Sequence, residues 1–213
     1  MELDRALLPV LSETMAPYPN VEIVPGDVLK LDLNALAAEK FHGLTPMVCA
    51  NLPYNITSPV LEKLVETPCF TSFTVMIQRE VARRICALPG TADYGAFSVY
   101  CQYHTRPELL FDVPPDCFLH APKVTSSVLR MVPCPPPPEV DDEAHFFRVV
   151  RAAFAQRRKT LVNSLSSALG VSLSKEALTK AVTDCGLPAD IRGERLSIGD
   201  FVALSRSLRR IQP

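Results

Sequence analysis

The sequence has no apolar run of the length that a membrane-spanning helix needs, which is about 18 residues or more. Its seven cysteines include no C-x-x-C pair, and the four histidines do not fall at zinc-ligand spacing from them. The hydrophobic content of 47% and the charged content of 21% are ordinary for a globular protein. We therefore expect a soluble cytoplasmic protein with buried, reduced thiols, no bound metal and no membrane partner.

Charge is distributed unevenly along the chain. Residues 1–142 hold 10 Lys and Arg against 17 Asp and Glu, whereas residues 143–213 hold 12 against 6. A basic segment behind an acidic body indicates a nucleic-acid binder with a separate binding surface. The prolines at 133 and 135–138 form a stiff, extended run that carries no core residue, which places a linker at 135–142. This predicts a catalytic domain over 1–134 and a helical domain after the linker.

Before the linker, apolar stretches alternate with amphipathic ones, which predicts an α/β fold. A mostly parallel, doubly wound sheet with an antiparallel edge pair fits this order. Ser58 is expected to cap a helix, with Pro59 at its first position. The expected strands are 21–24, 47–50, 73–77, 109–113 and 127–132, and the expected helices are 59–65 and 80–87.

After the linker, apolar residues recur at helical spacing over 144–169. Two further helices are expected. Ser174 caps the first, and Ser197 caps the second together with Asp200 three residues later. The sequence thus predicts a small C-terminal domain of three to four helices.

The tetrapeptide Asn51-Leu52-Pro53-Tyr54 follows an apolar strand, at the position where open α/β sheets bind their ligands. Its residue types suit alkylation of a planar amino nitrogen such as that of adenine. The side-chain oxygen of Asn51 and the carbonyl oxygen of Leu52 can accept both amino N–H bonds and free the nitrogen lone pair. Pro53 stiffens the loop, and Tyr54 offers a flat face for a base. The alternative is an ordinary turn, since Asn and Pro are common in turns.

Further motifs accompany this tetrapeptide in a fixed order. They are Glu2-Leu3-Asp4, Gly26-Asp27-Val28-Leu29, Gln78-Arg79-Glu80-Val81, Tyr94-Gly95-Ala96-Phe97-Ser98-Val99, Val113-Pro114-Pro115, Phe118, Pro122-Lys123-Val124 and Phe154-Ala155-Gln156-Arg157-Arg158-Lys159-Thr160-Leu161. Together they resemble the ribosomal RNA adenine dimethyltransferases, which use S-adenosyl-L-methionine. The likeness runs from Glu2 to about Leu208. It implies a Rossmann-like methyltransferase sheet that lacks its first strand, with a small all-helical C-terminal domain.

The resemblance also implies roles for residues at the cofactor and the target base. Glu2 would bind the ribose hydroxyls of S-adenosyl-L-methionine, Asp27 its adenine amino group, and Asn51 would help to hold it. Phe118 would clamp the target base opposite Tyr54. The alternatives are a solvated glutamate, an ordinary Gly-Asp turn and a core phenylalanine.

A basic cluster is expected to bind RNA. Arg151, Arg157, Arg158 and Lys159 fall within nine residues on what we expect to be one helix, where they would contact phosphates. A solvated helix face is the alternative explanation. The arginines of 79–84 are weaker candidates for the same role.

Two departures from the family pattern stand out. His120 and Ala121 occupy positions where the family usually has prolines. The sequence also has no Gly-x-Gly loop ahead of Glu2, and such a loop would bind the methionine end of the cofactor. Without the strand before that loop, two strand edges and a sheet face would be exposed. We therefore expect a fragment, or a mis-assigned start of a longer enzyme, that is inactive and marginally stable by itself.

The leading functional hypothesis is dimethylation of adenine amino groups in 16S, small-subunit ribosomal RNA during ribosome biogenesis. The expected partner is the pre-ribosomal small subunit, and the expected state is a monomer. One alternative is a non-catalytic RNA-binding factor for ribosome assembly or transcription. The presence of Asn51 disfavours this, because a pure binder needs no amine-orienting side chain. Another is a 23S ribosomal RNA methyltransferase that confers antibiotic resistance, which the basic C-terminal segment disfavours modestly.

Overall fold

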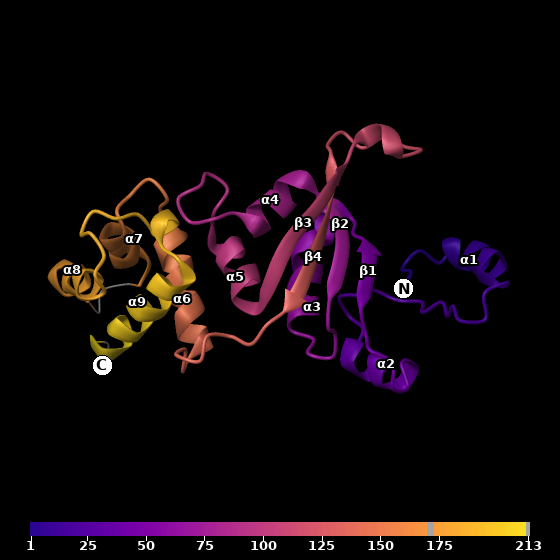
Figure 1. The fold of residues 1–213 in the computed structure, drawn as a ribbon, viewed down its shortest axis with the longest axis horizontal. Helices are drawn as coiled ribbons and strands as arrows, with labels where there is room; N and C mark the ends of the chain where they lie inside the picture. Colours follow the sequence, from indigo (N-terminus) through magenta and orange to yellow (C-terminus); the bar gives the residue numbers. More distant parts are fainter. Residues whose placement is uncertain (170–172, 212–213) are drawn as a thin grey trace.

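The structure, a computed structural model, describes residues 1–169 and 173–211. Four strands in these residues form one sheet in the order β1-β2-β4-β3. They are β1 (Val48–Asn51), β2 (Phe73–Gln78), β3 (Thr105–Val113) and β4 (Ser126–Pro133). β1 and β2 are parallel, whereas β4 is antiparallel to both β2 and β3 (Figure 1). The antiparallel edge pair is therefore as predicted, but the parallel part of the sheet is smaller than predicted.

Helices flank these strands and form the C-terminal part of the chain (Figure 1). The helices up to the end of the sheet are α1 (Leu7–Met15), α2 (Leu33–Lys40), α3 (Thr57–Val65), α4 (Arg79–Cys86) and α5 (Ala96–His104). Those after the linker are α6 (Glu143–Phe154), α7 (Leu161–Ala168), α8 (Lys175–Asp184) and α9 (Ile198–Ile211). Single 3-10 turns lie at Tyr54–Ile56, Pro115–Cys117 and Gly193–Arg195.

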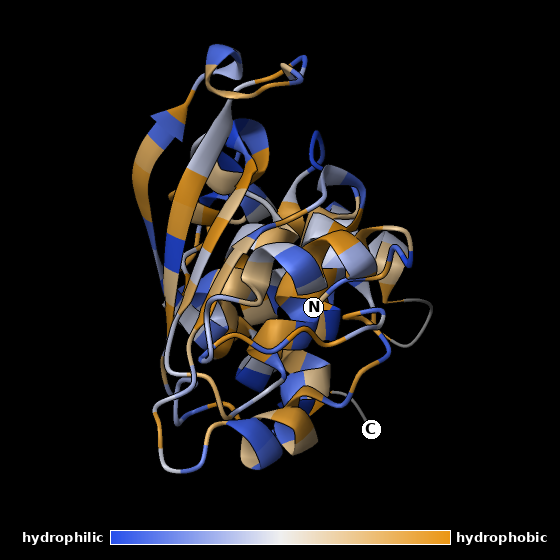
Figure 2. Cartoon of the chain, turned by 90° about the vertical axis from the view of Figure 1, so that its right-hand side faces the viewer, coloured by the Kyte–Doolittle hydropathy of each residue, from blue (hydrophilic) through white to orange (hydrophobic). Residues whose placement is uncertain are grey.

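The first hydrophobic core lies between the sheet and the helices α3, α4 and α5. Alternate β2 residues Phe73, Val75 and Ile77 are fully buried, because successive strand residues point to opposite faces. Leu61 of α3 and Ile85 of α4 belong to the same core. Figure 2 shows the strands along one side of the molecule and the helices beside them. The helices that share this core cover one face of the sheet.

The second core lies among the C-terminal helices and includes residues from before the linker. Tyr94 is fully buried there, and its hydroxyl donates to the Leu196 carbonyl at 2.9 Å. Burial raises the pKa of Tyr94 to about 12. Tyr103 of α5 stacks on Phe146 of α6 with ring centroids 4.8 Å apart. Contacts therefore cross the proline-rich segment, and the domain boundary at 135–142 stays a prediction.

Two local predictions are wrong. The predicted strand 21–24 is not a strand. Its only pairing is an isolated parallel bridge at its end, between Pro25 and Glu2. Ser58 does not cap α3: a 3-10 turn precedes this helix, which begins at Thr57, so Pro59 is its third residue. The predicted caps at the other end of the chain are confirmed. The Ser174 hydroxyl accepts from Ala177 N–H, and Ser197 and Asp200 bond reciprocally.

The exposure of the cysteines and the length of the helices test two further expectations. All seven cysteines are free thiols, but only Cys101 is buried, and Cys49 and Cys117 are exposed, so the predicted general burial is wrong. Helices in the described residues are too short or too polar to cross a membrane.

Candidate active site at the strand ends

The tetrapeptide lies at the carboxyl end of β1, as predicted, and a backbone hydrogen bond joins it to the neighbouring strand β2. Asn51 is the last residue of β1 and is exposed to solvent. Leu52 is 7% exposed, and its N–H donates to the Met76 carbonyl of β2 at 3.0 Å. The Pro53 carbonyl accepts from Ile56 N–H at 3.2 Å and from the Thr57 hydroxyl at 3.1 Å. Hydrogen bonds on both sides therefore fix the path of the backbone between Asn51 and α3.

Tyr54 is joined to the opposite part of the sheet. Its hydroxyl lies 2.6 Å from the hydroxyl of Ser126, the first residue of β4. Tyr54 is partly exposed, whereas Ser126 is fully buried. Ser126 also pairs with Gln78 of β2 and Val113 of β3. The ends of β1, β2 and β3 and the start of β4 therefore meet at the tetrapeptide.

Further polar contacts join the start of β4 to the ends of β2 and β3. The Ser127 hydroxyl donates to the Asp112 carboxylate at 2.6 Å, and that carboxylate lies 3.7 Å from the Arg79 guanidinium. The backbone N–H of Arg79 donates to the Thr125 carbonyl at 3.0 Å. Arg79 thus helps to hold the connection between β3 and β4. This makes it a weaker candidate for binding RNA. Sequence analysis missed this cluster, because nothing local signals contacts between such distant segments.

Phe118 lies in the β3–β4 connection, directly after the 3-10 turn Pro115–Cys117. It is partly exposed, and its neighbour Leu119 is 96% exposed. Figure 1 shows this connection projecting beyond the strand ends. The described residues include no ring contact between Phe118 and Tyr54. The predicted clamp of these two rings stays a prediction.

Glu2 and Asp27 lie on two backbone segments that an isolated parallel bridge between Glu2 and Pro25 joins. Glu2 N–H donates to the Val24 carbonyl at 3.0 Å, and the Glu2 carbonyl accepts from Gly26 N–H at 2.8 Å. Gly26 has φ +147°, and a Cβ there would lie 3.3 Å from the Leu31 side chain, so glycine suits this turn. One Asp27 carboxylate oxygen accepts from Leu29 N–H at 2.9 Å. Two carboxylates thus lie on adjacent backbone segments.

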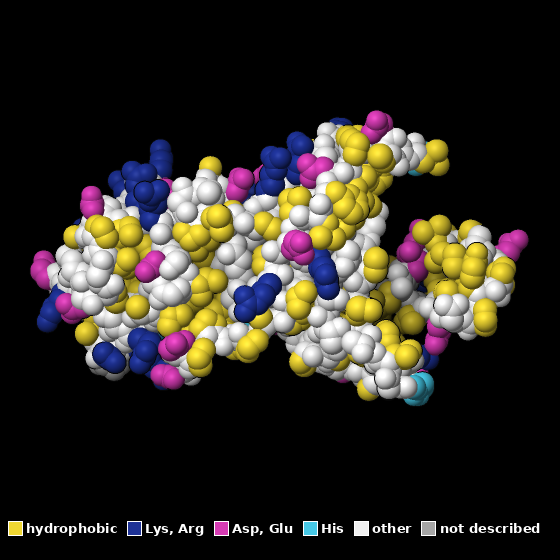
Figure 3. Space-filling model, in the orientation of Figure 1, with side chains coloured by type: hydrophobic (Ala, Val, Ile, Leu, Met, Phe, Trp, Pro, Cys, Tyr) yellow, Lys and Arg dark blue, Asp and Glu magenta, His cyan; other side chains and the backbone are white. Residues whose placement is uncertain are grey.

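The predicted basic helix is interrupted. Arg151 belongs to α6, but the helix ends at Phe154, and 157–159 form the turn before α7. The break occurs because Thr160 caps α7, its hydroxyl accepting from Asn163 N–H at 3.4 Å. Arg157 is held in this turn, where it donates to the Ala92 carbonyl at 2.7 Å and pairs with Glu194 at 3.3 Å. Figure 3 shows Lys and Arg side chains gathered over the C-terminal helices.

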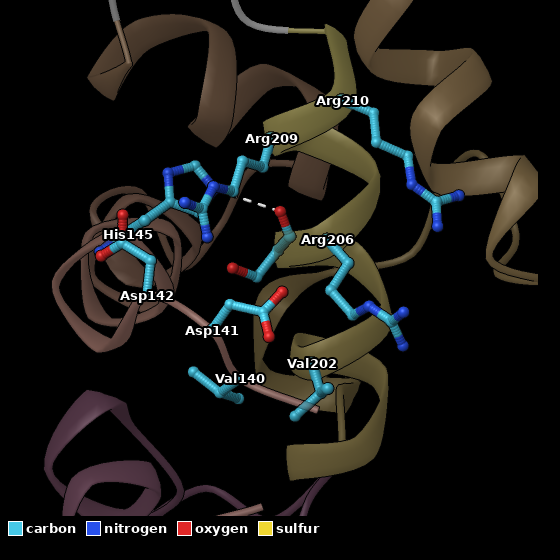
Figure 4. A pocket seen from close by; sticks show the side chains of 9 residues that line it. Val140, Asp141, Asp142, His145, Val202, Arg206, Arg209 and Arg210 are labelled. Atoms are coloured by element: carbon cyan, nitrogen blue, oxygen red, sulfur yellow. Dashed lines mark hydrogen bonds between the residues drawn. The ribbon is translucent and has the colours of Figure 1, made fainter. Parts of the chain in front are cut away.

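A second group of arginines, Arg206, Arg209 and Arg210 of α9, lines one wall of a pocket of about 370 Å³, and Asp141 and Asp142 of the segment before α6 line another (Figure 4). Arg209 extends toward His145, whereas Arg206 and Arg210 extend to the other side. The pKa of Asp142 is lowered, first by the hydrogen bond from His145 N–H and further by the Arg209 charge. Sequence analysis missed these arginines, although their spacing within the predicted last helix could have indicated them.

The arrangement suits an α/β enzyme that binds a flat, amine-bearing ligand at its strand ends. Asn51 offers an exposed amide, Tyr54 a ring held at its hydroxyl, and Glu2 and Asp27 carboxylates from two adjacent backbone segments. Open α/β sheets bind their ligands at this end of the strands, so the position fits a ligand-binding site. The sequence matches the family described as ribosomal RNA adenine dimethylase over residues 1–208, and the chain belongs to this family of enzymes.

Relatives agree with this membership. The ribosomal RNA small subunit methyltransferase A of Bacillus mycoides (strain KBAB4) is 47% identical over 211 residues, covering 97% of this chain and 72% of that protein. The same figures hold for the protein of that name from Bacillus cereus (strain AH187).

Solved structures show the same fold. A dimethyladenosine transferase from Plasmodium falciparum aligns with a TM-score of 0.76 at 21% identity, over 99% of this chain and 81% of that one. The 23S rRNA methyltransferase ErmE aligns with a TM-score of 0.67 at 22% identity, over 98% of this chain and 80% of that one. The second name gives 23S rRNA as the substrate, whereas the first gives only dimethyladenosine transfer.

Proposed function

We propose that this chain carries the amine-orienting and RNA-binding residues of an enzyme that dimethylates adenine amino groups in small-subunit ribosomal RNA. The observation that carries the proposal is the exposed Asn51 amide at the end of β1, beside a Leu52 backbone anchored to β2. The names of the Bacillus relatives favour the small subunit over the 23S alternative. The pre-ribosomal small subunit in the cytoplasm is the proposed partner, and the monomer is the proposed state.

We propose that the tetrapeptide activates the amine by accepting hydrogen bonds from its two N–H groups. The adenine amino nitrogen is a weak nucleophile because its lone pair is delocalised into the ring. Two acceptors, the Asn51 amide oxygen and the Leu52 carbonyl oxygen, draw the two N–H bonds out of the ring plane and localise that lone pair. With the cofactor bound, the nitrogen would bond to the methyl carbon as the sulfur–carbon bond breaks. The cationic amine would lose its proton afterwards, so no strong base is needed. Positioning supplies much of the rate, and the hydrogen bonds on both sides of the loop provide it.

The carboxylates of Glu2 and Asp27 fit the nucleoside part of S-adenosyl-L-methionine. Both are hydrogen-bond acceptors, which suits ribose hydroxyls and an adenine amino group, and the backbone bond between Gly26 and Glu2 keeps their backbone segments adjacent. Asn51 lies at the end of the edge strand on the same side of the sheet, and we propose that it contacts the cofactor as well. When bound, the cofactor supplies an electrophilic methyl group. The chain's own residues bind it and hold the amine in line.

Base clamping and RNA binding complete the proposal. A target adenine must leave its stack, which costs a few kcal/mol and is least costly in a loop. Stacking on Tyr54, with Phe118 opposite, returns about 1–3 kcal/mol per base. The basic residues of the C-terminal part contact phosphates; they are Arg151, Arg157, Arg158 and Lys159 on one side, and Arg206, Arg209 and Arg210 around the pocket.

The test is transfer of tritiated methyl groups to undermethylated small ribosomal subunits, with large-subunit RNA as a parallel substrate. The proposed function predicts label in small-subunit adenines as dimethyladenine after nuclease digestion, and such label would contradict the expectation from the sequence that the chain is inactive by itself. Label confined to large-subunit RNA would instead support the resistance methyltransferase. RNA binding without any transfer in a single-turnover assay would support the non-catalytic factor. Isothermal titration with S-adenosyl-L-methionine measures cofactor binding separately, because the sequence has no Gly-x-Gly loop.

A further inference from the structure

We propose that Ser126 is a positioning residue for the reaction: its hydroxyl holds the Tyr54 ring in the orientation that stacks on the target base. The two hydroxyl oxygens are 2.6 Å apart, although the residues are 72 positions apart in the sequence. The inference rests on the proposed function for the identity of the base. The hydrogen bond itself is a property of the fold.

Ser126 is the fixed member of the pair. It is fully buried at the start of β4, a strand that lies between β2 and β3. Its backbone is paired with Gln78 on one side and Val113 on the other. Tyr54, by contrast, is partly exposed in a single 3-10 turn. The buried strand therefore sets the place of the hydroxyl pair, and the tyrosine ring is the part that is held.

The start of β4 is itself held by polar contacts on its other side. The Ser127 hydroxyl donates to Asp112, and Asp112 in turn lies 3.7 Å from the Arg79 guanidinium. The Thr125 carbonyl accepts from Arg79 N–H at 3.0 Å. Since alternate strand residues point to opposite faces, Ser126 can face Tyr54 while Ser127 faces Asp112. The anchor of the tyrosine is thus fixed by three strands.

The hydrogen bond restricts the rotation of a partly exposed aromatic ring. A neutral hydrogen bond contributes a net amount equivalent to about a twofold to tenfold shift in population. Losing it leaves the Tyr54 ring present but distributed over more orientations, so fewer of them stack on a base. The expected consequence is a smaller fraction of productive complexes, with phosphate contacts unchanged.

The experiment compares Tyr54→Phe, Ser126→Ala, the double variant and Ser126→Thr. Binding to an RNA hairpin with one 2-aminopurine in an adenine-rich loop is followed by fluorescence, which stacking quenches. The chain has no tryptophan to interfere. We expect each single variant to weaken the quenched state by about twofold to tenfold. The double variant should show no further loss, and Ser126→Thr, which keeps a hydroxyl, should behave as wild type.

Ser164→Ala is the matched control. It removes another fully buried serine hydroxyl, bonded to the Ala152 carbonyl at 2.7 Å in the helical part, and should change stability but not quenching. Denaturant unfolding of the same set gives the coupling between positions 54 and 126 without RNA or cofactor.

Three results would overturn the inference: additive losses in the double variant, Ser126→Ala behaving as Ser164→Ala, or no quenching by wild type. In the methyl-transfer assay, kcat should fall with KM for RNA unchanged. Absence of transfer by every variant would instead count against the proposed function.

Discussion

The amine-binding half of the site, Asn51–Tyr54, and the cofactor-binding half, Glu2 with Asp27, are held in different ways. The first half is attached to the sheet through Leu52 and to β4 through Tyr54. The second is held by one isolated bridge and by hydrogen bonds between near neighbours. α1, which follows Glu2, has no buried residue. Figure 3 shows hydrophobic side chains at the surface of this N-terminal part.

The difference shows where rigidity is concentrated. Local opening is easiest where few apolar contacts are buried and hydrogen bonds face solvent. The first buried side chain of the chain is Leu33, well after Glu2 and Asp27. Orientation of the amine therefore depends on a packed sheet, whereas the carboxylates at the cofactor depend on short-range hydrogen bonds. Substitutions in the two halves should therefore have different effects on methyl transfer, on the free energy of unfolding and on amide exchange.

The largest expected effect is on chemistry. Asn51→Ala removes one of two acceptors at the amine, and we expect methyl transfer to fall about 100-fold to 1000-fold, as when one polar group is lost from a preorganised site. The side chain is exposed, so stability and RNA affinity should stay nearly unchanged. Single-turnover transfer and filter binding measure the two quantities. Equal loss of both would contradict the role assigned to Asn51.

The next effect is on stability and compares two leucines in helices. Leu61 of α3 is 1% exposed, and Leu61→Ala should lower the free energy of unfolding by about 2–5 kcal/mol through the cavity it leaves. Leu7 of α1 is 46% exposed, and Leu7→Ala should change it by less than about 0.5 kcal/mol. Urea unfolding followed by circular dichroism measures both. Similar values for the two variants would break the comparison.

Amide hydrogen exchange compares the local stability of the two halves without any substitution. The amide of Leu52 donates into the sheet, whereas the amides of Glu2 and Gly26 belong to the isolated bridge. We expect Leu52 to exchange on the order of 100-fold more slowly, since its opening requires disruption of the sheet. Amide exchange followed by nuclear magnetic resonance gives the rates. Equal protection would show that the cofactor-binding half is as firmly held.

The smallest effect lies outside both halves. Arg158→Ala should reduce the slope of log affinity against log salt by about one, because one phosphate contact is lost. Arg157→Ala is the comparison, since Arg157 also pairs with Glu194 and bonds the Ala92 carbonyl, and it should lower stability as well. RNA filter binding over a salt series, with thermal unfolding alongside, separates the two. An unchanged slope for Arg158→Ala would remove it from the RNA surface.

Local patterns predicted much of the fold and some of the site. The apolar stretch before Asn51 predicted a strand that carries the tetrapeptide at its carboxyl end, and the capping signals at Ser174 and Ser197 were confirmed. Predictions that assumed a partner or a continuous helix were wrong. The strand at 21–24 pairs only with Glu2. The basic helix ends at Phe154, and Thr160 caps the next helix, which begins at Leu161.

The sequence alone determined the chemistry on offer: an amide, a carbonyl and an aromatic ring in one short loop, together with separate acidic and basic groups. These follow from residue type, periodicity and capping, which act over a few positions. Only the tertiary structure decided which distant groups meet. It brought Ser126 to Tyr54, Arg79 to Asp112 and Arg157 to Glu194. Strand order and helix packing set these distances, and no local pattern records which segments will become neighbours.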